Sequence, residues 1–95
     1  MPEMRFSIRW PDGTPETCYS PSLVVKDFLA PGATYPLADF LARSRTALNL
    51  ASERVEAKYG WSCSRAMAQL ERIETAARAF AHVADARVTV DAFEE

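Results

Sequence analysis

The sequence predicts an α+β fold. A three-stranded antiparallel sheet, in the order ββαααβ, is expected to pack on a long antiparallel helix hairpin plus a short helix. All six prolines lie within the first 36 of the 95 residues, and all sixteen alanines lie from Ala30 onward. Because proline breaks helices and alanine favours them, the chain divides into a strand-bearing start and a helical body. Apolar and polar residues alternate at both ends of the chain, which predicts strands there.

The first predicted strand spans residues 4–10, where apolar and polar side chains alternate at every position. This period of two is typical of a strand with one buried face. Residues 10–13 (WPDG) follow and favour a turn, because proline presets φ and glycine accepts a positive φ. Residues 16–20 then return as the second strand of a hairpin.

Two registers fit this hairpin. A two-residue turn pairs Phe6 with Tyr19 and matches charged and aromatic residues across the strands. A three-residue loop with a bulge at Gly13 pairs Phe6 with Cys18 and places the thiol on the core face. We favour the second register because Pro11 constrains the backbone at that turn position.

A short helix is expected over residues 21–29. Ser20 would serve as its N-cap and Pro21 as its first residue, which are the positions these residue types prefer. Residues 30–33 (APGA) would then end this helix.

The longest helix is expected from Pro36 to about Tyr59, because apolar residues recur there at spacings of three and four. Gly60 suits the position after a helix end. Ser62 or Ser64 would cap the next helix, and the short connection makes the two helices antiparallel.

The final segment, residues 87–93, alternates again and predicts the third strand. Val88, Val90 and Ala92 would face the core. Pairing with the N-terminal hairpin would stabilise it, since two strands alone are marginal.

Composition limits the function. The net charge is −2, 48% of residues are hydrophobic and 25% are charged, as in one globular domain spanning residues 1–95. A pI of about 5.4 disfavours binding to nucleic acid. No apolar run reaches the roughly 18 residues that a membrane span requires, and no signal peptide is apparent. We therefore expect a cytoplasmic protein without membrane or nucleic-acid partners.

The supply of catalytic and metal-binding residues is small. Cys18, Cys63 and His82 are the only cysteines and histidine, fewer than the four ligands of a structural zinc site. The sequence lacks the GxSxG, P-loop and GxGxxG patterns. We expect free thiols and neither a metal nor a cofactor.

The main candidate site is the start of the second long helix, where backbone N–H groups point outward and serines, a thiol and a basic residue gather. It could bind a small anion or carboxylate, hold a redox-sensitive Cys63, or be an ordinary capped hairpin. Two arginines of the first long helix could contact a ligand or partner, or form surface ion pairs. Ser20 could join the main site if the two serine-capped helix starts share a pocket. The candidate residues are Ser20, Arg43, Arg45, Tyr59, Trp61, Ser62, Cys63, Ser64 and Arg65.

Several segments stand in a distinctive order along the chain. They are residues 1–6 (MPEMRF), 9–13 (RWPDG), 18–22 (CYSPS), 35–40 (YPLADF), 44–45 (SR), 58–60 (KYG) and 63–66 (CSRA). In these segments the chain resembles the small nitrogen-starvation-response family first named from a mycobacterial member. The resemblance implies a bacterial gene cluster with a nitrilase, a radical-SAM protein, an acetyltransferase-like protein and a flavin oxidoreductase, linked to nitriles or cyanide as nitrogen source. It supplies no catalytic or binding residue.

These observations predict a non-enzymatic accessory or regulatory protein that acts through protein–protein contacts. Its partner would be a second copy, giving a homodimer, or a protein encoded in the same cluster. The alternative is a small ligand-binding subunit or enzyme that uses the helix start at residues 61–65.

Overall fold

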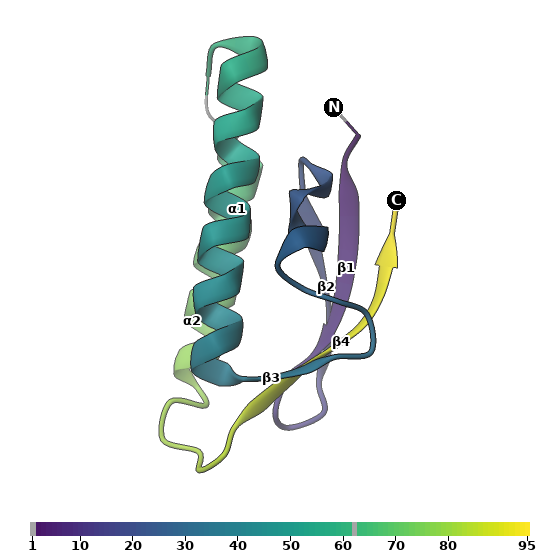
Figure 1. Cartoon of the computed structure of the whole chain (residues 1–95). Helices are drawn as coiled ribbons and strands as arrows, with labels where there is room; N and C mark the ends of the chain where they lie inside the picture. Colours follow the sequence, from purple (N-terminus) through teal and green to yellow (C-terminus); the bar gives the residue numbers. More distant parts are fainter. Residues whose placement is uncertain (1, 62) are drawn as a thin grey trace.

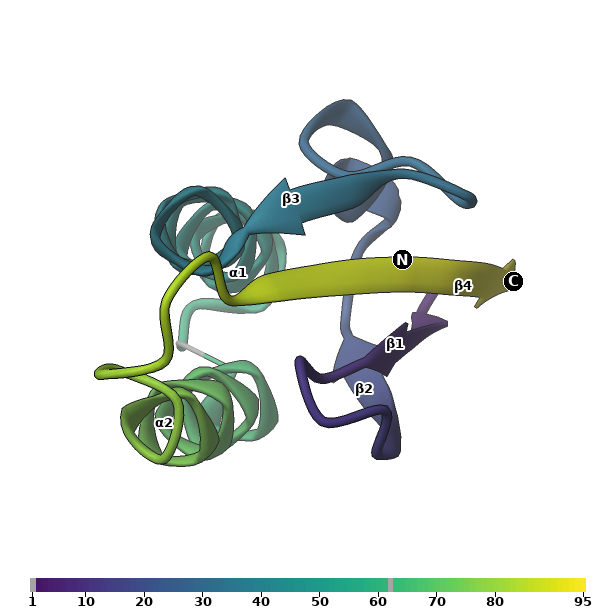
Figure 2. The same cartoon turned by 90° about the horizontal axis from the view of Figure 1, so that it is seen from below.

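The alternating segments at the two ends of the chain meet in one antiparallel sheet. The structure, a computed structural model, describes residues 2–61 and 63–95. The sheet has the order β2-β1-β4-β3, and helices α1 and α2 form a hairpin on one side of it (Figures 1 and 2). The elements are β1 (Met4–Arg9), β2 (Pro15–Ser20), the 3-10 helix η1 (Leu23–Asp27), β3 (Thr34–Pro36), α1 (Leu37–Tyr59), α2 (Ser64–Arg78) and β4 (Arg87–Glu94).

The α+β class is confirmed, but the prediction of three strands is wrong because β3 is a fourth. Tyr35 in β3 pairs with Val88 in β4. The pairing continues upstream, where the Gly32 N–H donates to the Val90 carbonyl at 2.7 Å. β3 has only three residues and ends in a proline, which an edge strand tolerates. Such a segment has no alternation from which a strand could be predicted.

The hairpin adopts the bulged register, with Phe6 opposite Cys18. The Gly13 N–H donates to the Trp10 carbonyl at 2.8 Å, and the Trp10 N–H donates to the Thr14 carbonyl at 2.9 Å. Gly13 has φ 88°, a conformation that glycine adopts without strain. The constraint from the turn proline therefore outweighs the alternative side-chain pairs, and Cys18 is buried in the core.

β4 keeps its predicted inward valines, but the prediction for Ala92 is wrong. Ile8 of β1 lies opposite Val90, whereas Ser7 lies opposite Ala92, so Asp91 is an extra residue at a bulge. The bulge shifts the alternation by one position, which leaves Ala92 exposed.

The short helix differs from its prediction in length, type and cap. It is a 3-10 helix of five residues, and Ser22, not Ser20, is its N-cap. The Ser22 Oγ accepts from the Val24 N–H at 3.3 Å. Ser20 cannot take this role because it is still the last residue of β2.

The long helix agrees closely with its prediction. It begins after Pro36 and ends at Tyr59, and Gly60 follows with φ 88° and donates its N–H to the Glu56 carbonyl at 2.8 Å. In α2 the N-cap is Cys63, without a capping side-chain bond, so Ser64 is the first helical residue and not the cap.

Trp10 connects the sheet to both helices. Its ring meets Phe40 of α1 edge-on and stacks with Phe80 just after α2, each at a centroid distance of 5.9 Å. Its Nε1 donates to Glu16 Oε1 at 3.0 Å, and Glu16 Oε2 accepts from Arg72 Nε of α2 at 3.0 Å. These contacts set the position of α2 beside β2.

In the part of the chain that the structure describes, neither helix is both long and apolar enough to cross a membrane.

Two buried serines of α1 predict opposite mutational effects. Ser44 Oγ has no hydrogen-bond partner among the described residues, whereas Ser52 Oγ accepts from the Cys63 N–H at 3.2 Å. We expect Ser44→Ala to raise the free energy of unfolding by about 1 kcal/mol, because it removes an unsatisfied buried hydroxyl. Ser52→Ala should lower it by about 1 kcal/mol. Urea denaturation measures both, and a Ser44→Ala protein less stable than wild type would contradict the assignment.

Candidate functional site

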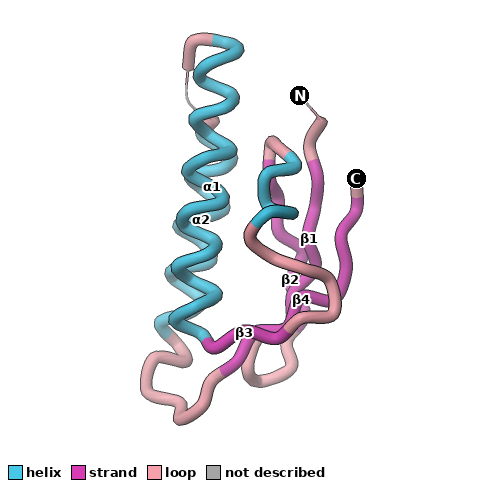
Figure 3. Tube along the Cα trace, in the orientation of Figure 1, coloured by secondary structure: helices cyan, strands magenta, loops and turns pink. Residues whose placement is uncertain are grey.

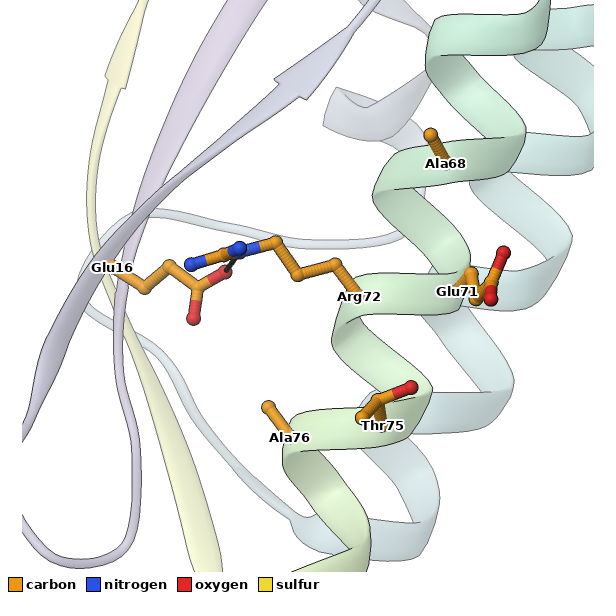
Figure 4. A pocket seen from close by; sticks show the side chains of 6 residues that line it. All are labelled: Glu16, Ala68, Glu71, Arg72, Thr75 and Ala76. Carbon is orange, nitrogen blue, oxygen red and sulfur yellow. Dashed lines mark hydrogen bonds and ion pairs between the residues drawn. The ribbon is translucent and has the colours of Figure 1, made fainter.

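The surface between α2 and the edge strand β2 is hollowed in two adjoining places that share Ala68 and Arg72. The larger hollow has a volume of about 440 Å³ and the smaller about 280 Å³. Figure 4 shows the larger one, which is lined by Glu16, Ala68, Glu71, Arg72, Thr75 and Ala76. The smaller one is lined by Tyr19, Arg65, Ala68, Gln69 and Arg72.

The guanidinium group of Arg65 packs over the aromatic ring of Tyr19. Its guanidinium carbon lies 3.9 Å from the centroid of the Tyr19 ring, and its Nη1 lies 3.9 Å from Glu3 Oε2. Burial raises the pKa of the Tyr19 phenol, while the Arg65 cation acts in the opposite direction. The Arg65 side chain remains 63% exposed, so much of its donor capacity faces solvent.

Gln69 covers the edge of β2. Its Oε1 accepts from the Tyr19 N–H at 2.9 Å, an N–H that points away from β1 at the open edge of the sheet. This bond fixes the orientation of the amide, and Nε2 is buried with no hydrogen-bond partner among the described residues. An edge closed in this way is less available for pairing with another strand.

Arg72 crosses from α2 to β2. Figure 4 shows its side chain reaching Glu16, with Ala68 and Ala76 on either side along the helix. The Glu16 side chain is 16% exposed, whereas that of Arg72 is 72% exposed. The hydrogen bond uses Nε, which leaves the outer part of the guanidinium facing solvent.

Of the residues predicted from sequence, Tyr59 and Trp61 lie together at the tip of the hairpin. Their rings stack at 6.3 Å, and their exposures are 47% and 69%. Lys58 Nζ lies 5.5 Å from the Tyr59 ring centroid. Figure 1 shows this end of the hairpin projecting beyond the sheet, and neither residue lines the hollows.

Ser20 is buried, and its hydroxyl is engaged within its own turn. Its Oγ donates to the Ser22 carbonyl at 2.7 Å and accepts from the Ser22 N–H at 3.3 Å. Ser62 lies outside the described residues, and with it the predicted pocket shared by Ser20 and Ser62. Ligand binding by Ser20 stays a prediction.

Arg43 and Arg45 of α1 make ion pairs and hydrogen bonds within the chain. Arg43 pairs with Asp39 at 3.0 Å, donates to the Phe28 carbonyl at 2.8 Å and lies over the Tyr35 ring at 4.8 Å.

Arg45 pairs with Glu74 of α2 at 2.7 Å. Neither arginine lines the two hollows. Ser64 is exposed beside Arg65, at the first position of α2.

The thiols and the imidazole do not form a catalytic pair. Burial raises the pKa of the Cys18 thiol far above its ordinary range, which keeps it neutral. Cys63 is partly buried at the start of α2. His82 lies in the loop after α2, at the other end of a helix about 22 Å long (Figure 3). A general base must lie within hydrogen-bond reach of its nucleophile, so His82 cannot activate Cys63 in this arrangement.

In residues 2–61 and 63–95, no three His, Cys, Asp or Glu side chains cluster as a metal site requires.

A family model described as nitrogen starvation-induced protein NitG matches residues 5–93. The chain belongs to this family. The match runs from β1 into β4 and includes all residues that line the two hollows. It confirms the resemblance seen in the sequence. No curated protein and no solved structure matches the chain.

Sequence reasoning missed Gln69, Arg72 and Glu16 in this NitG-family chain. A signal was present for two of them, because positions 65, 69 and 72 fall on one side of a helix. Their relation to Tyr19 could not be read from the sequence, since the Tyr19–Gln69 bond joins residues fifty positions apart.

The buried thiol predicts a pH dependence of stability. Burial raises the pKa of the Cys18 thiol in the folded state, so the folded protein binds this proton more tightly than the unfolded chain does. The stability that the buried thiol contributes is therefore fully present below the ordinary thiol pKa of about 8.5, and it is lost as the pH rises above that value. We expect the free energy of unfolding to fall by up to about 1.4 kcal/mol per pH unit above about pH 9. The decline should be shallower in Cys18→Ala than in the matched Cys63→Ala. Denaturation at several pH values measures it, and equal slopes would contradict the account.

Proposed function

We propose that this protein serves the nitrogen-starvation response as a non-enzymatic accessory or regulatory protein that binds a partner protein. The NitG family provides the starvation context. In this proposal the gene belongs to a nitrilase-containing cluster for the use of nitriles, and the partner is encoded in the same cluster.

The observation that carries the proposal is the exposed aromatic pair at the hairpin tip. Trp61 is 69% exposed and Tyr59 is 47% exposed, whereas Trp10 is buried in the core. Trp and Tyr are enriched among the residues that dominate binding energy at interfaces. Tyr and Trp have only two χ angles each, so little conformational entropy is lost when a partner covers them.

The geometry of the thiols supports a non-enzymatic role. Cys18 is buried and neutral, and Cys63 and His82 lie at opposite ends of α2. The two hollows lie on the surface between one helix and one strand, and such sites enclose less of a small molecule than a typical ligand pocket does.

We expect Trp61→Ala combined with Tyr59→Ala to weaken partner binding without loss of stability, because both rings are solvent-exposed. The test is co-purification from nitrogen-starved cells, read out as the recovery of proteins encoded beside the gene. Val83→Ala is the control, since Val83 is an exposed apolar residue in the loop after α2, away from the tip.

Recovery of a cluster-encoded protein should fall at least about tenfold in the double variant and stay unchanged in the control. Equal recovery by both variants, or no cluster-encoded protein with wild type, would contradict the proposal.

A second candidate function is the binding of a small carboxylate or other anion in the smaller hollow. Two guanidinium groups, Arg65 and Arg72, line that hollow, and charge-assisted bonds from arginine suit carboxylates. We expect glutarate or phosphate to raise the melting temperature saturably, and Arg65→Ala to remove the effect. No shift with either anion, or an equal shift in Arg65→Ala, would exclude this candidate.

A further inference from the structure

The smaller hollow has an arginine at each end. Arg65 and Arg72 stand seven positions apart on α2, which places them on nearly the same side of the helix with a rise of about 10 Å between them. The residues they contact on β2, Tyr19 and Glu16, are three positions apart, which is also about 10 Å along a strand. The two guanidinium groups are therefore spread along the hollow, too far apart to bind one carboxylate together.

The space between the two arginines is open because the side chain between them is small. Ala68 lines the smaller hollow and is exposed, and Figure 4 shows it one turn before Arg72 on the same side of α2. The hollow has a volume of about 280 Å³. A short carbon chain with a polar group at each end suits a space of this shape.

The polar side-chain groups that remain unused in this hollow are mainly donors. Gln69 Oε1 already accepts from the Tyr19 N–H at 2.9 Å, whereas Gln69 Nε2 has no partner among the described residues. Arginine side chains have donors only. A ligand of this hollow must therefore supply acceptors, and carboxylates are the acceptors that guanidinium groups bind most strongly.

We propose that the smaller hollow binds a small dicarboxylate, with one carboxylate on Arg65 and the other on Arg72. This inference rests on the second candidate function, anion binding in the smaller hollow, and adds the class of the ligand. It assigns the two arginines separate roles, because each one binds a different end of the same molecule.

The ion pairs that the two arginines make within the chain are compatible with such a ligand. Arg72 bonds to Glu16 through Nε, so its two terminal nitrogens are available to a carboxylate. Arg65 Nη1 lies 3.9 Å from Glu3 Oε2, and both side chains are at least half exposed. Such a surface pair contributes little stability, so a ligand carboxylate can replace Glu3 at small cost.

The test compares ligands of equal length that differ in one charge. Straight-chain dicarboxylates from malonate to suberate are each titrated beside their own monoamide, in which one carboxylate is a neutral amide. We expect one optimal chain length, at which the dicarboxylate binds at least about tenfold more tightly than its monoamide, because the amide loses the charge-assisted bonds to one arginine. NMR titration of the isotope-labelled chain measures the dissociation constants, and the Gln69 side-chain amide signals report binding in the hollow.

Three variants assign the effect to the two arginines. In Arg65→Ala and in Arg72→Ala, the preference for the dicarboxylate over its monoamide should fall below about twofold, since one carboxylate has lost its partner. Arg78→Ala is the matched control, because Arg78 is an exposed arginine of α2 that lines neither hollow, and it should keep the wild-type preference. If Arg72→Ala alters the packing of α2, Arg65→Ala keeps the test decisive, since its ion-pair partner Glu3 is exposed.

The outcomes separate this inference from the proposal on which it rests. A wild-type preference below about twofold at every chain length would overturn the two-ended ligand, while anion binding in the hollow would stand. A wild type that binds none of these ligands would overturn both. Retention of the preference in Arg65→Ala, or its loss in Arg78→Ala, would overturn the assignment to the two arginines. None of these variants alters the hairpin tip, so the test is independent of partner binding by Tyr59 and Trp61.

Discussion

The arrangement of this small fold depends on one buried indole. Trp10, at the end of β1, contacts Phe40 of α1 and Phe80 beyond α2, and it donates a hydrogen bond to Glu16 of β2. The aromatic contacts carry most of the energy, because a buried tryptophan removes a large apolar area from water. The Glu16–Arg72 pair adds less, since Arg72 is mostly exposed, but it aligns α2 with the edge of the sheet. Both hollows therefore take their positions from Trp10.

The helix hairpin offers two distinct surfaces. Its tip carries the exposed aromatic pair Tyr59 and Trp61, and the side of α2 next to β2 carries the two hollows. In the proposed function, the tip binds a partner protein. The exposed aromatic pair supports an accessory role in the nitrogen-starvation response better than the separated thiols and imidazole support an enzyme.

Sequence patterns were sufficient to predict those parts of the fold that depend on interactions between residues close together in the chain. The alternation in residues 4–10 predicted β1, the turn proline selected the bulged register, and Gly60 marked the end of α1. Contacts between distant residues were not predictable in this way. β3 is defined by hydrogen bonds to β4 over three residues, and the bulge at Asp91 changes the alternation within a strand. At the site, Arg65 was predicted as a residue at a helix start, but its stacking on Tyr19 arises only because α2 packs beside β2.

We propose that this protein acts through the surfaces of its helix hairpin and not through side-chain chemistry. The most direct test is a complete single-substitution scan of the chain, scored by growth of the source organism on limiting nitrogen. Apart from the core, the account predicts strong sensitivity at Tyr59 and Trp61 and tolerance at Cys63 and His82. A scan in which the exposed tip tolerates substitution while Cys63 or His82 does not would contradict the account.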